Sequence, residues 1–340
     1  MNKKILAILM ALLMVLTSVA AFAEGEGTTT SKNPVGINEI VATKTYTGNK
    51  ENVTAPTEVF NFKVTPVDNT TVALNDVATD AITATGTVVE ATSKIDLTKC
   101  VELGKYNYTI TEVVPETQTA GVTYNENKEE YTVLVQVLAE LGENDIPTGQ
   151  VVRNVIMKNK AGTKVEKAAF ENKYEAGSLT VKKSIEGNMA TKTDKATVTV
   201  TFTAKAGTEV KSAIGVAAGD VTATPSTTDA SWTTCTYTLT NVTNASEIVF
   251  TNVPSGVSFE VKQTAQNDDN VTKTYTTTYE PTTTTGTVAA DSADVITIID
   301  TATEEIATGV FTDNMPYFML LAFVMILAAA VVLKKRTVNE

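Results

Sequence analysis

The sequence predicts an all-β protein made of two tandem β-sandwich domains, and two observations support this prediction. First, short stretches rich in Thr and Val alternate apolar and polar residues, which is typical of half-buried antiparallel strands. Clear examples are residues 59–64, 106–110, 131–135 and 197–202. Second, the same order of elements occurs twice along the chain. No long helical period lies between these stretches, so we expect the strands to pack face to face as sandwiches.

The internal repeat divides the chain into two similar halves. Each half opens with a lysine-bearing strand, at residues 40–44 and 179–183. Each half later has a Gly followed by an aromatic-bearing strand, at residues 104–112 and 256–263. We place the boundary between the halves at residues 174–177. Both halves then have the ordinary size of a single domain.

The repeat and the chain ends together define the domain organisation. We assign residues 35–175 to the first sandwich and residues 176–303 to the second, with residues 24–34 as a flexible start. A Thr-rich stretch at residues 276–287 fits a loop and a twisted edge strand equally well, because composition does not distinguish them.

The N-terminus has the pattern of a secretory signal peptide. Residues 1–23 contain two early lysines, an apolar run at residues 5–16 and a small-x-small site at residues 21–23, so we expect cleavage before Glu24. The apolar run is too short to span a bilayer comfortably, which argues against an uncleaved anchor. The mature chain is therefore predicted to be exported.

The C-terminus has the pattern of a membrane tether. Residues 317–333 carry no charge, and at about 1.5 Å per residue a helix of this length reaches roughly 26 Å, close to the thickness of a hydrocarbon core. The basic segment 334–340 follows at once and is expected to stay in the cytoplasm. The two sandwiches are then displayed at the cell surface.

Composition excludes several classes of function. The net charge is −12 and there is no histidine, so the chain lacks both a basic nucleic-acid footprint and the commonest general base and metal ligand. We expect no nucleic-acid partner, no metal and no cofactor. The two cysteines, Cys100 and Cys235, are far apart in sequence, and we interpret them as separate buried thiols rather than a disulfide.

Three polar residues are predicted to point the same way as the apolar side chains of their own strands. They are Lys44, Glu112 and Asn172, as counting in twos along each strand shows. Burying a lone lysine or carboxylate is costly, so each needs a partner or a hydrated position at the rim of the sandwich. One arrangement satisfies all three: an isopeptide bond between Lys44 and Asn172, with Glu112 beside it. The alternation of faces along the strands does not by itself exclude hydrated positions at the rim of the sandwich.

The chemistry of such a bond needs these residue types. Burial favours the neutral, nucleophilic form of a lysine and the protonated form of a carboxyl. A protonated Glu can polarise the Asn carbonyl and move protons as ammonia leaves.

In this setting the chain resembles the major pilins of Gram-positive bacteria. Their tandem collagen-adhesin-B-like sandwiches, which are immunoglobulin-like, carry intramolecular Lys–Asn isopeptide bonds beside a Glu. In that family the lysine lies on the first strand, the Glu ends a Tyr-x-(Val/Ile)-Thr-Glu strand, and the Asn follows Phe-x. The matching positions here are Lys44, Tyr108–Glu112 and Phe170–Asn172. The resemblance implies a Lys44–Asn172 bond formed with Glu112 as the catalytic acid and base.

The second domain departs from the family pattern. Lys183 matches the lysine position, but Gln263 stands where the Glu is expected and Asp300 where the Asn is expected. Lys–Asp isopeptide bonds, formed with loss of water, exist in the wider family, yet a Gln cannot donate a proton as a carboxylic acid does. A Lys183–Asp300 isopeptide bond and a Lys183–Asp300 ion pair both remain open.

A motif in the linker at residues 304–316 resembles a sortase sorting signal, which combines Leu-Pro-x-Thr-Gly, an apolar span and a basic tail. The five residues concerned are Glu305, Ile306, Ala307, Thr308 and Gly309. Only Thr308 and Gly309 agree with the general motif, although major pilins also use Glu-Val-Pro-Thr-Gly. The resemblance implies cleavage after Thr308 by a sortase cysteine and transfer of the acyl group to an amine.

The segment Ile146–Gly149 also has the Pro-Thr-Gly part of a sorting signal. No apolar span follows it, and Pro and Gly at these places suit a tight connection between strands. We therefore expect a turn there.

Polymerisation requires a lysine on the next subunit to accept the acyl group. In the related pilins it lies a few residues before the first-domain Asn. Lys164, eight residues before Asn172, fits this position, and Lys160 and Lys167 are close rivals. A solvated lysine cluster on a loop is the structural alternative.

The sequence thus predicts a structural shaft subunit of a covalent pilus, not an enzyme. Its expected partners are a pilus-type sortase, copies of itself arranged head to tail, minor pilins and the host surface. The first alternative is a wall-anchored adhesin displayed singly, which needs no acceptor lysine. A surface hydrolase is a second alternative, but we find no convergent acid, base and nucleophile for it.

Overall fold

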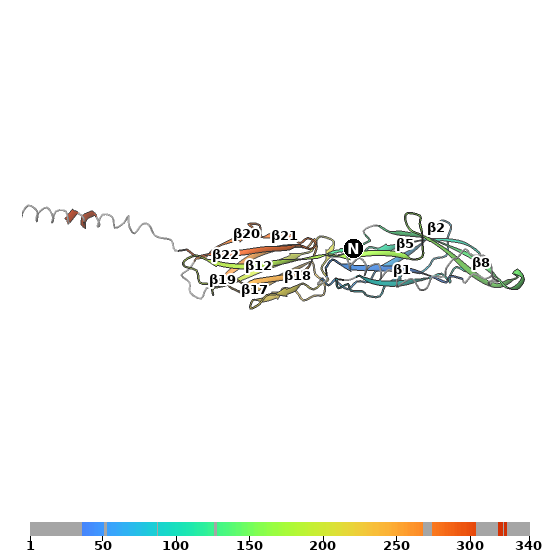
Figure 1. Cartoon of the computed structure of the whole chain (residues 1–340), viewed down its shortest axis with the longest axis horizontal. Helices are drawn as coiled ribbons and strands as arrows, with labels where there is room; N and C mark the ends of the chain where they lie inside the picture. Colours follow the sequence, from blue (N-terminus) through green and yellow to red (C-terminus); the bar gives the residue numbers. More distant parts are fainter. Residues whose placement is uncertain are drawn as a thin grey trace, which may run out of the picture.

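The computed structural model describes residues 36–50, 53–86, 88–125, 128–267, 274–303, 319–321 and 323–324. It shows two β-sandwich domains arranged end to end (Figure 1), which confirms the all-β prediction. The predicted signal peptide, flexible start, sorting signal and basic tail lie outside the described residues. So does most of the predicted span at residues 317–333. In the part of the chain that is described, no helix is long and apolar enough to cross a membrane.

The first domain packs a four-stranded sheet against a six-stranded sheet. The strand order is β4-β1-β11-β7 in the former and β10-β9-β8-β5-β2-β3 in the latter. The strands are β1 (Glu39–Gly48), β2 (Asn61–Val67), β3 (Val77–Ala78), β4 (Val89–Asp96), β5 (Gly104–Val113), β6 (Gln118–Thr119), β7 (Val122–Thr123), β8 (Glu130–Leu141), β9 (Pro147–Lys158), β10 (Lys164–Val165) and β11 (Ala168–Tyr174).

The turn predicted at Ile146–Gly149 is wrong by about three residues. Strands β8 and β9 form a long hairpin that extends from the end of the first domain farther from the second (Figure 1). Its connection is a short 3-10 turn at Glu143–Asp145, and the strand β9 already begins at Pro147. Asn144 and Asp145 both adopt a φ of 59°, a left-handed conformation that Asn and Asp tolerate better than most residues. The turn therefore lies just before Pro147, at Asn144 and Asp145, whose side chains tolerate this conformation.

The second domain consists of two five-stranded sheets, with the orders β15-β18-β12-β22-β20 and β16-β17-β13-β19-β21. The strands are β12 (Ala176–Glu186), β13 (Lys195–Thr203), β14 (Thr208–Glu209), β15 (Gly215–Ala217), β16 (Thr222–Pro225), β17 (Thr234–Val242), β18 (Glu247–Pro254), β19 (Ser258–Asn267), β20 (Thr276–Glu280), β21 (Thr285–Thr287) and β22 (Ala293–Thr301). The Thr-rich stretch at residues 276–287 therefore supplies an edge strand to each sheet.

Both domains place their first and last long strands side by side and parallel. In the first domain β1 pairs with β11, from Ala42 opposite Ala168 to Gly48 opposite Tyr174. In the second, β12 pairs with β22 in the same sense. This pairing joins residues more than a hundred positions apart, and it brings the ends of each domain's sequence into one sheet.

Each domain has its own apolar core. Aromatic rings centre both cores: Phe62 stacks on Phe170 with ring centroids 5.0 Å apart, and Phe202 meets Phe250 edge to face at 5.3 Å. Cys100 and Cys235 are buried in different domains and are free thiols, as expected from the sequence.

The two domains meet directly, because only Glu175 separates β11 from β12. The side-chain amide of Asn49 exchanges hydrogen bonds with the backbone N–H and carbonyl of Ala176 at 3.3 and 2.9 Å. The buried Tyr174 hydroxyl donates to Ser212 Oγ at 2.9 Å. The short strand β6 of the first domain pairs with β14 of the second. These contacts make the junction a packed interface and not an open linker.

Candidate functional site

The first-domain site lies inside the sandwich, where the two sheets face each other. Lys44 is on β1 and Asn172 on the neighbouring strand β11, while Glu112 is on β5 of the opposite sheet. The parallel register sets Asn172 opposite Tyr46, two residues beyond Lys44, so both side chains point into the interior. The relative exposures of Lys44, Glu112 and Asn172 are 0%, 7% and 3%. The hydrated rim position left open by the sequence is therefore wrong for all three.

Glu112 touches both of the other residues. Lys44 Nζ lies 2.7 Å from Glu112 Oε2, and Asn172 Nδ2 donates to Glu112 Oε1 over the same distance. The other side of the Asn172 amide is also bound, because the backbone N–H of Asn125 donates to Asn172 Oδ1 at 2.6 Å. The carboxyl group thus bridges an amine and an amide that sit on adjacent strands.

The surroundings favour a reactive amine. Lys44 Nζ lies 4.8 Å from the centroid of the Phe60 ring, in the apolar core of the domain. Burial lowers the pKa of Lys44 from 10.5 to about 8, although the neighbouring Glu112 partly opposes this shift. An appreciable fraction of neutral amine is then available near neutral pH, as nucleophilic attack requires.

This arrangement can form an amide. The neutral Lys44 amine would attack the side-chain carbonyl carbon of Asn172, and the Asn125 N–H is placed to stabilise charge on its oxygen. Glu112 contacts both the attacking and the leaving nitrogen, so it can accept a proton from the first and deliver one to the second.

The second domain holds a related cluster at the equivalent place. Lys183 on β12 and Asp300 on the adjacent β22 form an ion pair, and both side chains are fully buried. Gln263, on β19 of the facing sheet, accepts from Lys183 Nζ at 2.7 Å. Its Nε2 donates to both Asp300 oxygens, at 3.1 and 3.0 Å. Thr277 adds a hydroxyl that donates to Asp300 Oδ1 at 2.7 Å.

The electrostatics of the second cluster combine burial with direct pairing. Burial lowers the pKa of Lys183, and the hydrogen bond and charge of Asp300 oppose that shift. Gln263 and Thr277 both donate hydrogen bonds to the Asp300 carboxylate oxygens.

The lysines predicted as polymerisation acceptors are all exposed. Lys164 lies in β10, at the edge of the six-stranded sheet, opposite Lys158 of β9. Lys160 precedes it in the connecting turn, where its Nζ donates to the Lys128 carbonyl at 3.3 Å. Lys167 directly precedes β11. Residues 305–309 of the sorting signal lie outside the described residues.

Two contributors to these sites were missed by the sequence analysis. Asn125 acts through its backbone N–H from a loop, with a φ of 39°, and a count of strand faces does not reach loops. Thr277 belongs to the Thr-rich stretch whose conformation composition left open. The only sequence signal for Thr277 is its position in a Thr-rich run, and many other Thr residues have the same signal.

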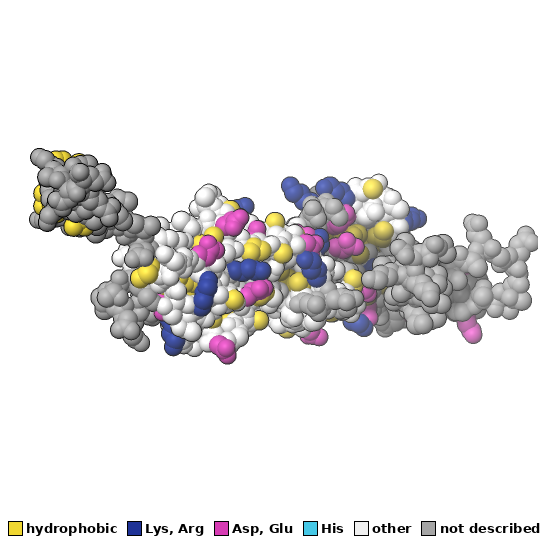
Figure 2. Space-filling view, turned by 60° about the vertical axis from the view of Figure 1, so that its left-hand side comes forward, with side chains coloured by type: hydrophobic (Ala, Val, Ile, Leu, Met, Phe, Trp, Pro, Cys, Tyr) yellow, Lys and Arg dark blue, Asp and Glu magenta, His cyan; other side chains and the backbone are white. Residues whose placement is uncertain are grey.

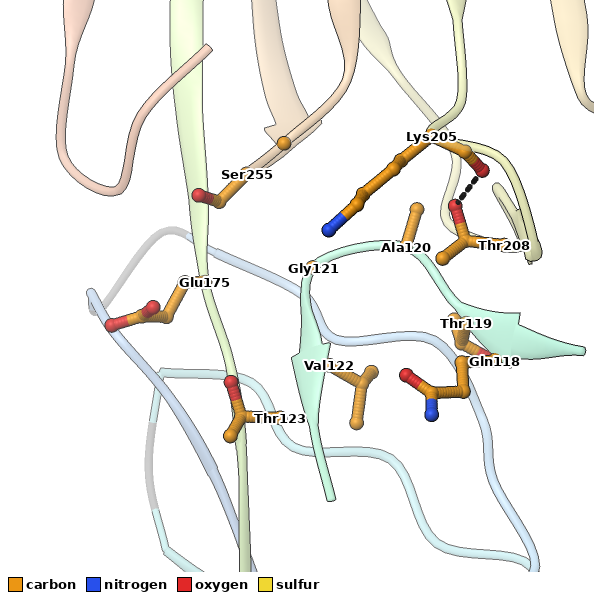
Figure 3. A pocket seen from close by; sticks show the side chains of 11 residues that line it. Gln118, Thr119, Ala120, Gly121, Val122, Thr123, Glu175, Lys205, Thr208 and Ser255 are labelled. Atoms are coloured by element: carbon orange, nitrogen blue, oxygen red, sulfur yellow. Dashed lines mark hydrogen bonds between the residues drawn. The ribbon is translucent and has the colours of Figure 1, made fainter. Parts of the chain in front are cut away.

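Away from these clusters, the described surface has several open pockets. A pocket of about 240 Å³ lies at the domain junction, where the side chain of Lys205 extends over Gly121 (Figure 3). On the face shown in Figure 2, acidic and basic side chains are interspersed over the described residues. Among those residues we find no group of three or more Cys, Asp or Glu side chains that could hold a metal ion.

Comparison with known families assigns the first domain. Residues 40–175 match the model of the Spy0128-like isopeptide containing domain. The first domain is therefore similar to the Spy0128-like isopeptide domains. This match spans the strands that carry Lys44, Glu112 and Asn172, and it confirms for this domain the resemblance inferred from the sequence. Residues 177–302 match a domain of unknown function, DUF7601.

A comparison with solved structures matched several pilus proteins. The major pilin from Streptococcus pyogenes is 22% identical, with a TM-score of 0.47, and the match covers 79% of this chain and 99% of that one. The T3.2 major pilin from the same species is 16% identical, with a TM-score of 0.46 and coverages of 81% and 99%. The pilus-presented adhesin Spy0125 (Cpa) is 10% identical, with a TM-score of 0.29, and the match covers 77% of this chain and 100% of that one. No curated protein sequence matches the chain.

Proposed function

We propose that this protein is the structural shaft subunit of a covalent, sortase-polymerised pilus. The observation that carries the proposal is the buried contact of Glu112 with both Lys44 and Asn172, in a domain of the Spy0128-like isopeptide family. The protein is exported, held briefly in the membrane by its C-terminal span and then transferred to the growing fibre. Its role is mechanical and not enzymatic.

In the mature protein Lys44 Nζ is bonded to the side-chain carbon of Asn172. The C–N bond to Asn172 Nδ2 breaks, and that nitrogen leaves as ammonia with the protons that Glu112 relays. The bond closes a loop in which Glu112 lies 68 residues after Lys44 and 60 before Asn172. By analogy with disulfides, closing a loop of this size stabilises the domain by roughly 4–5 kcal/mol. It also ties the first strand to the last, so tension passes without unfolding the domain.

Intact mass tests the internal bond. The purified mature protein is expected to weigh one ammonia less than its sequence, and the Glu112→Ala variant is expected to have the full mass. Glu130→Ala, an exposed carboxylate change in β8, is the matched control and keeps the shift. A wild-type protein of full mass would rule out the Lys44–Asn172 bond.

Assembly proceeds through the sorting signal and an acceptor lysine. A sortase cleaves after Thr308, and Lys164 of the next subunit resolves the acyl-enzyme, so that subunits join head to tail. The exposure of Lys164 on an edge strand supports this role, and the exposed Lys160 and Lys167 are the alternatives.

An immunoblot of cell-wall digests, boiled in detergent, tests assembly. Wild-type cells are expected to give a ladder of multimers, and the ladder is expected to vanish in Lys164→Ala but not in Lys160→Ala or Lys167→Ala. Loss of the ladder in one of the latter variants would move the acceptor to that lysine. A single band from every strain would identify a wall-anchored adhesin displayed singly instead.

A further inference from the structure

The second-domain cluster has the parts of an isopeptide site except for a group that can transfer protons. Making an amide from Lys183 and Asp300 requires a neutral amine to attack the Asp300 carboxyl carbon. A carboxyl oxygen must then leave as water, having gained protons that the amine gave up. In the first domain Glu112 contacts both reacting groups and can carry those protons.

Gln263 occupies the bridging position but cannot transfer protons between Lys183 and Asp300. Its Oε1 accepts from Lys183 Nζ and its Nε2 donates to Asp300, so its contacts mirror those of Glu112. A carboxamide is neither an acid nor a base in the range of pH that proteins tolerate. Its amide protons stay on Nε2, and its oxygen holds the lysine by a hydrogen bond without removing a proton.

The hydrogen bonds of the cluster hold Lys183 and Asp300 in place without supplying an acid. Gln263 and Thr277 both donate hydrogen bonds to the Asp300 carboxylate, and neither side chain is an acid that can protonate it. Asp300 also contacts Lys183 directly, so the two groups can form an ion pair inside the sandwich. A carboxylate resists nucleophilic attack, and an ammonium has no lone pair with which to attack. The cluster therefore suits a stable ion pair.

We propose that Lys183 and Asp300 stay an ion pair and do not become covalently linked, so that they form a non-covalent latch between β12 and β22, and that the second domain is the part of the chain that extends under load. The mechanical half of this inference rests on the proposed function of the protein as a shaft subunit. The chemical half, the absence of a second cross-link, stands on the cluster alone.

The strand geometry explains why the latch matters. β11 continues into β12 across the junction, and the chain leaves the second domain after β22. Tension along a shaft pulls the start of β12 and the end of β22 apart, and because these strands are parallel neighbours it shears one past the other. The latch joins these two strands directly. A covalent bond there would resist the shear, whereas an ion pair yields to it.

Peptide mapping by mass spectrometry of the purified two-domain mature chain tests the inference. In the wild type we expect Lys183 and Asp300 to appear in separate, unmodified peptides. In Gln263→Glu the new carboxyl restores proton transfer, so we expect a cross-linked Lys183–Asp300 peptide that is one water lighter than its two parts. The control Gln263→Met supplies no acid and is expected to remain unlinked.

The outcomes are distinct from those that test assembly. A cross-linked Lys183–Asp300 peptide in the wild type would overturn the proposal, even if the cell-wall ladder shows a working shaft. A Gln263→Glu variant that is folded, as judged by its circular dichroism, but unlinked would show that Gln263 is not what prevents the bond. An absent ladder with an unlinked wild-type second domain would retain the latch and remove only its mechanical role.

Discussion

In both domains a lysine on the first strand faces a side chain on the last strand, and a third residue from the opposite sheet touches both. In the first domain the bridging group is the carboxyl of Glu112 and the target is an amide. In the second the bridge is the amide of Gln263 and the target is a carboxylate. The two clusters are alike in their buried lysine and target and in the strands that supply them, and they differ in which residue carries the acid.

The comparison separates what the fold supplies from what the side chains supply. Parallel pairing of the first and last strands brings lysine and target together in each sandwich, whatever the chemistry. Proton transfer depends on one functional group in the bridging residue. We therefore propose that the first domain is cross-linked and that the second is held without a covalent bond, and the following experiments exchange or weaken these two behaviours.

The largest expected difference appears under force. When the mature two-domain chain is pulled from its ends, the second domain should unfold in a single event. Gln263 lies 80 residues after Lys183 and 37 before Asp300, so the released segment adds about 400 Å at roughly 3.5 Å per residue. Single-molecule force spectroscopy measures this length. Gln263→Glu should abolish the event, and a wild-type chain that shows no extension would contradict the comparison.

The next effect comes from making the first domain resemble the second. Glu112→Gln keeps the shape of the bridge but removes its acid, so the Lys44–Asn172 bond should not form. The unfolding free energy of that domain should fall by about 4–5 kcal/mol, the loop-closure contribution. Denaturant unfolding with intact mass on the same sample checks both. Glu130→Gln is the control, and a Glu112→Gln protein that still lacks one ammonia would contradict the assigned role.

A third experiment measures how the stability of a first domain that cannot cross-link depends on pH. In Asn172→Ala the pKa of Lys44 should stay lowered by burial, at about 8 in the folded state against 10.5 unfolded. The unfolded chain then binds more protons between these values, so stability should rise with pH from about 8 to about 10.5, by up to about 3 kcal/mol. Below pH 8 the full cost of burying the ammonium remains. Adding Lys44→Met should flatten this profile in denaturant titrations, and a profile that falls with pH would contradict it.

The smallest effect probes the support of the latch. Thr277→Val removes the hydroxyl that donates to Asp300, which should cost the second domain about 1–2 kcal/mol without any change in cross-linking. Thr278→Val, at an exposed position on the same strand, is the control and should be nearly neutral. Thermal unfolding monitored by circular dichroism compares the two variants, and equal stabilities would mean that Thr277 does not support the carboxylate.

Much of the fold and part of the sites could be predicted from local patterns. Alternation over short stretches indicates strands because side chains on a pleated strand face opposite ways. The same count placed Lys44, Glu112 and Lys183 on apolar faces, and each is buried in the structure. The position of the hairpin turn was missed because Pro and Gly at Ile146–Gly149 suggested a turn, whereas the backbone turns at Asn144 and Asp145.

The sequence by itself determined which chemical groups are present and which face of a strand each one takes. It therefore already contained the contrast between Glu112 and Gln263, since a carboxyl can relay protons and a carboxamide cannot. Only the tertiary structure decided which groups touch. The parallel pairing of β1 with β11, the packing of β5 across them and the reach of the Asn125 loop all join segments distant in sequence. Local side-chain periodicity carries no information about such long-range partners, because they are selected by the packing of the whole sandwich.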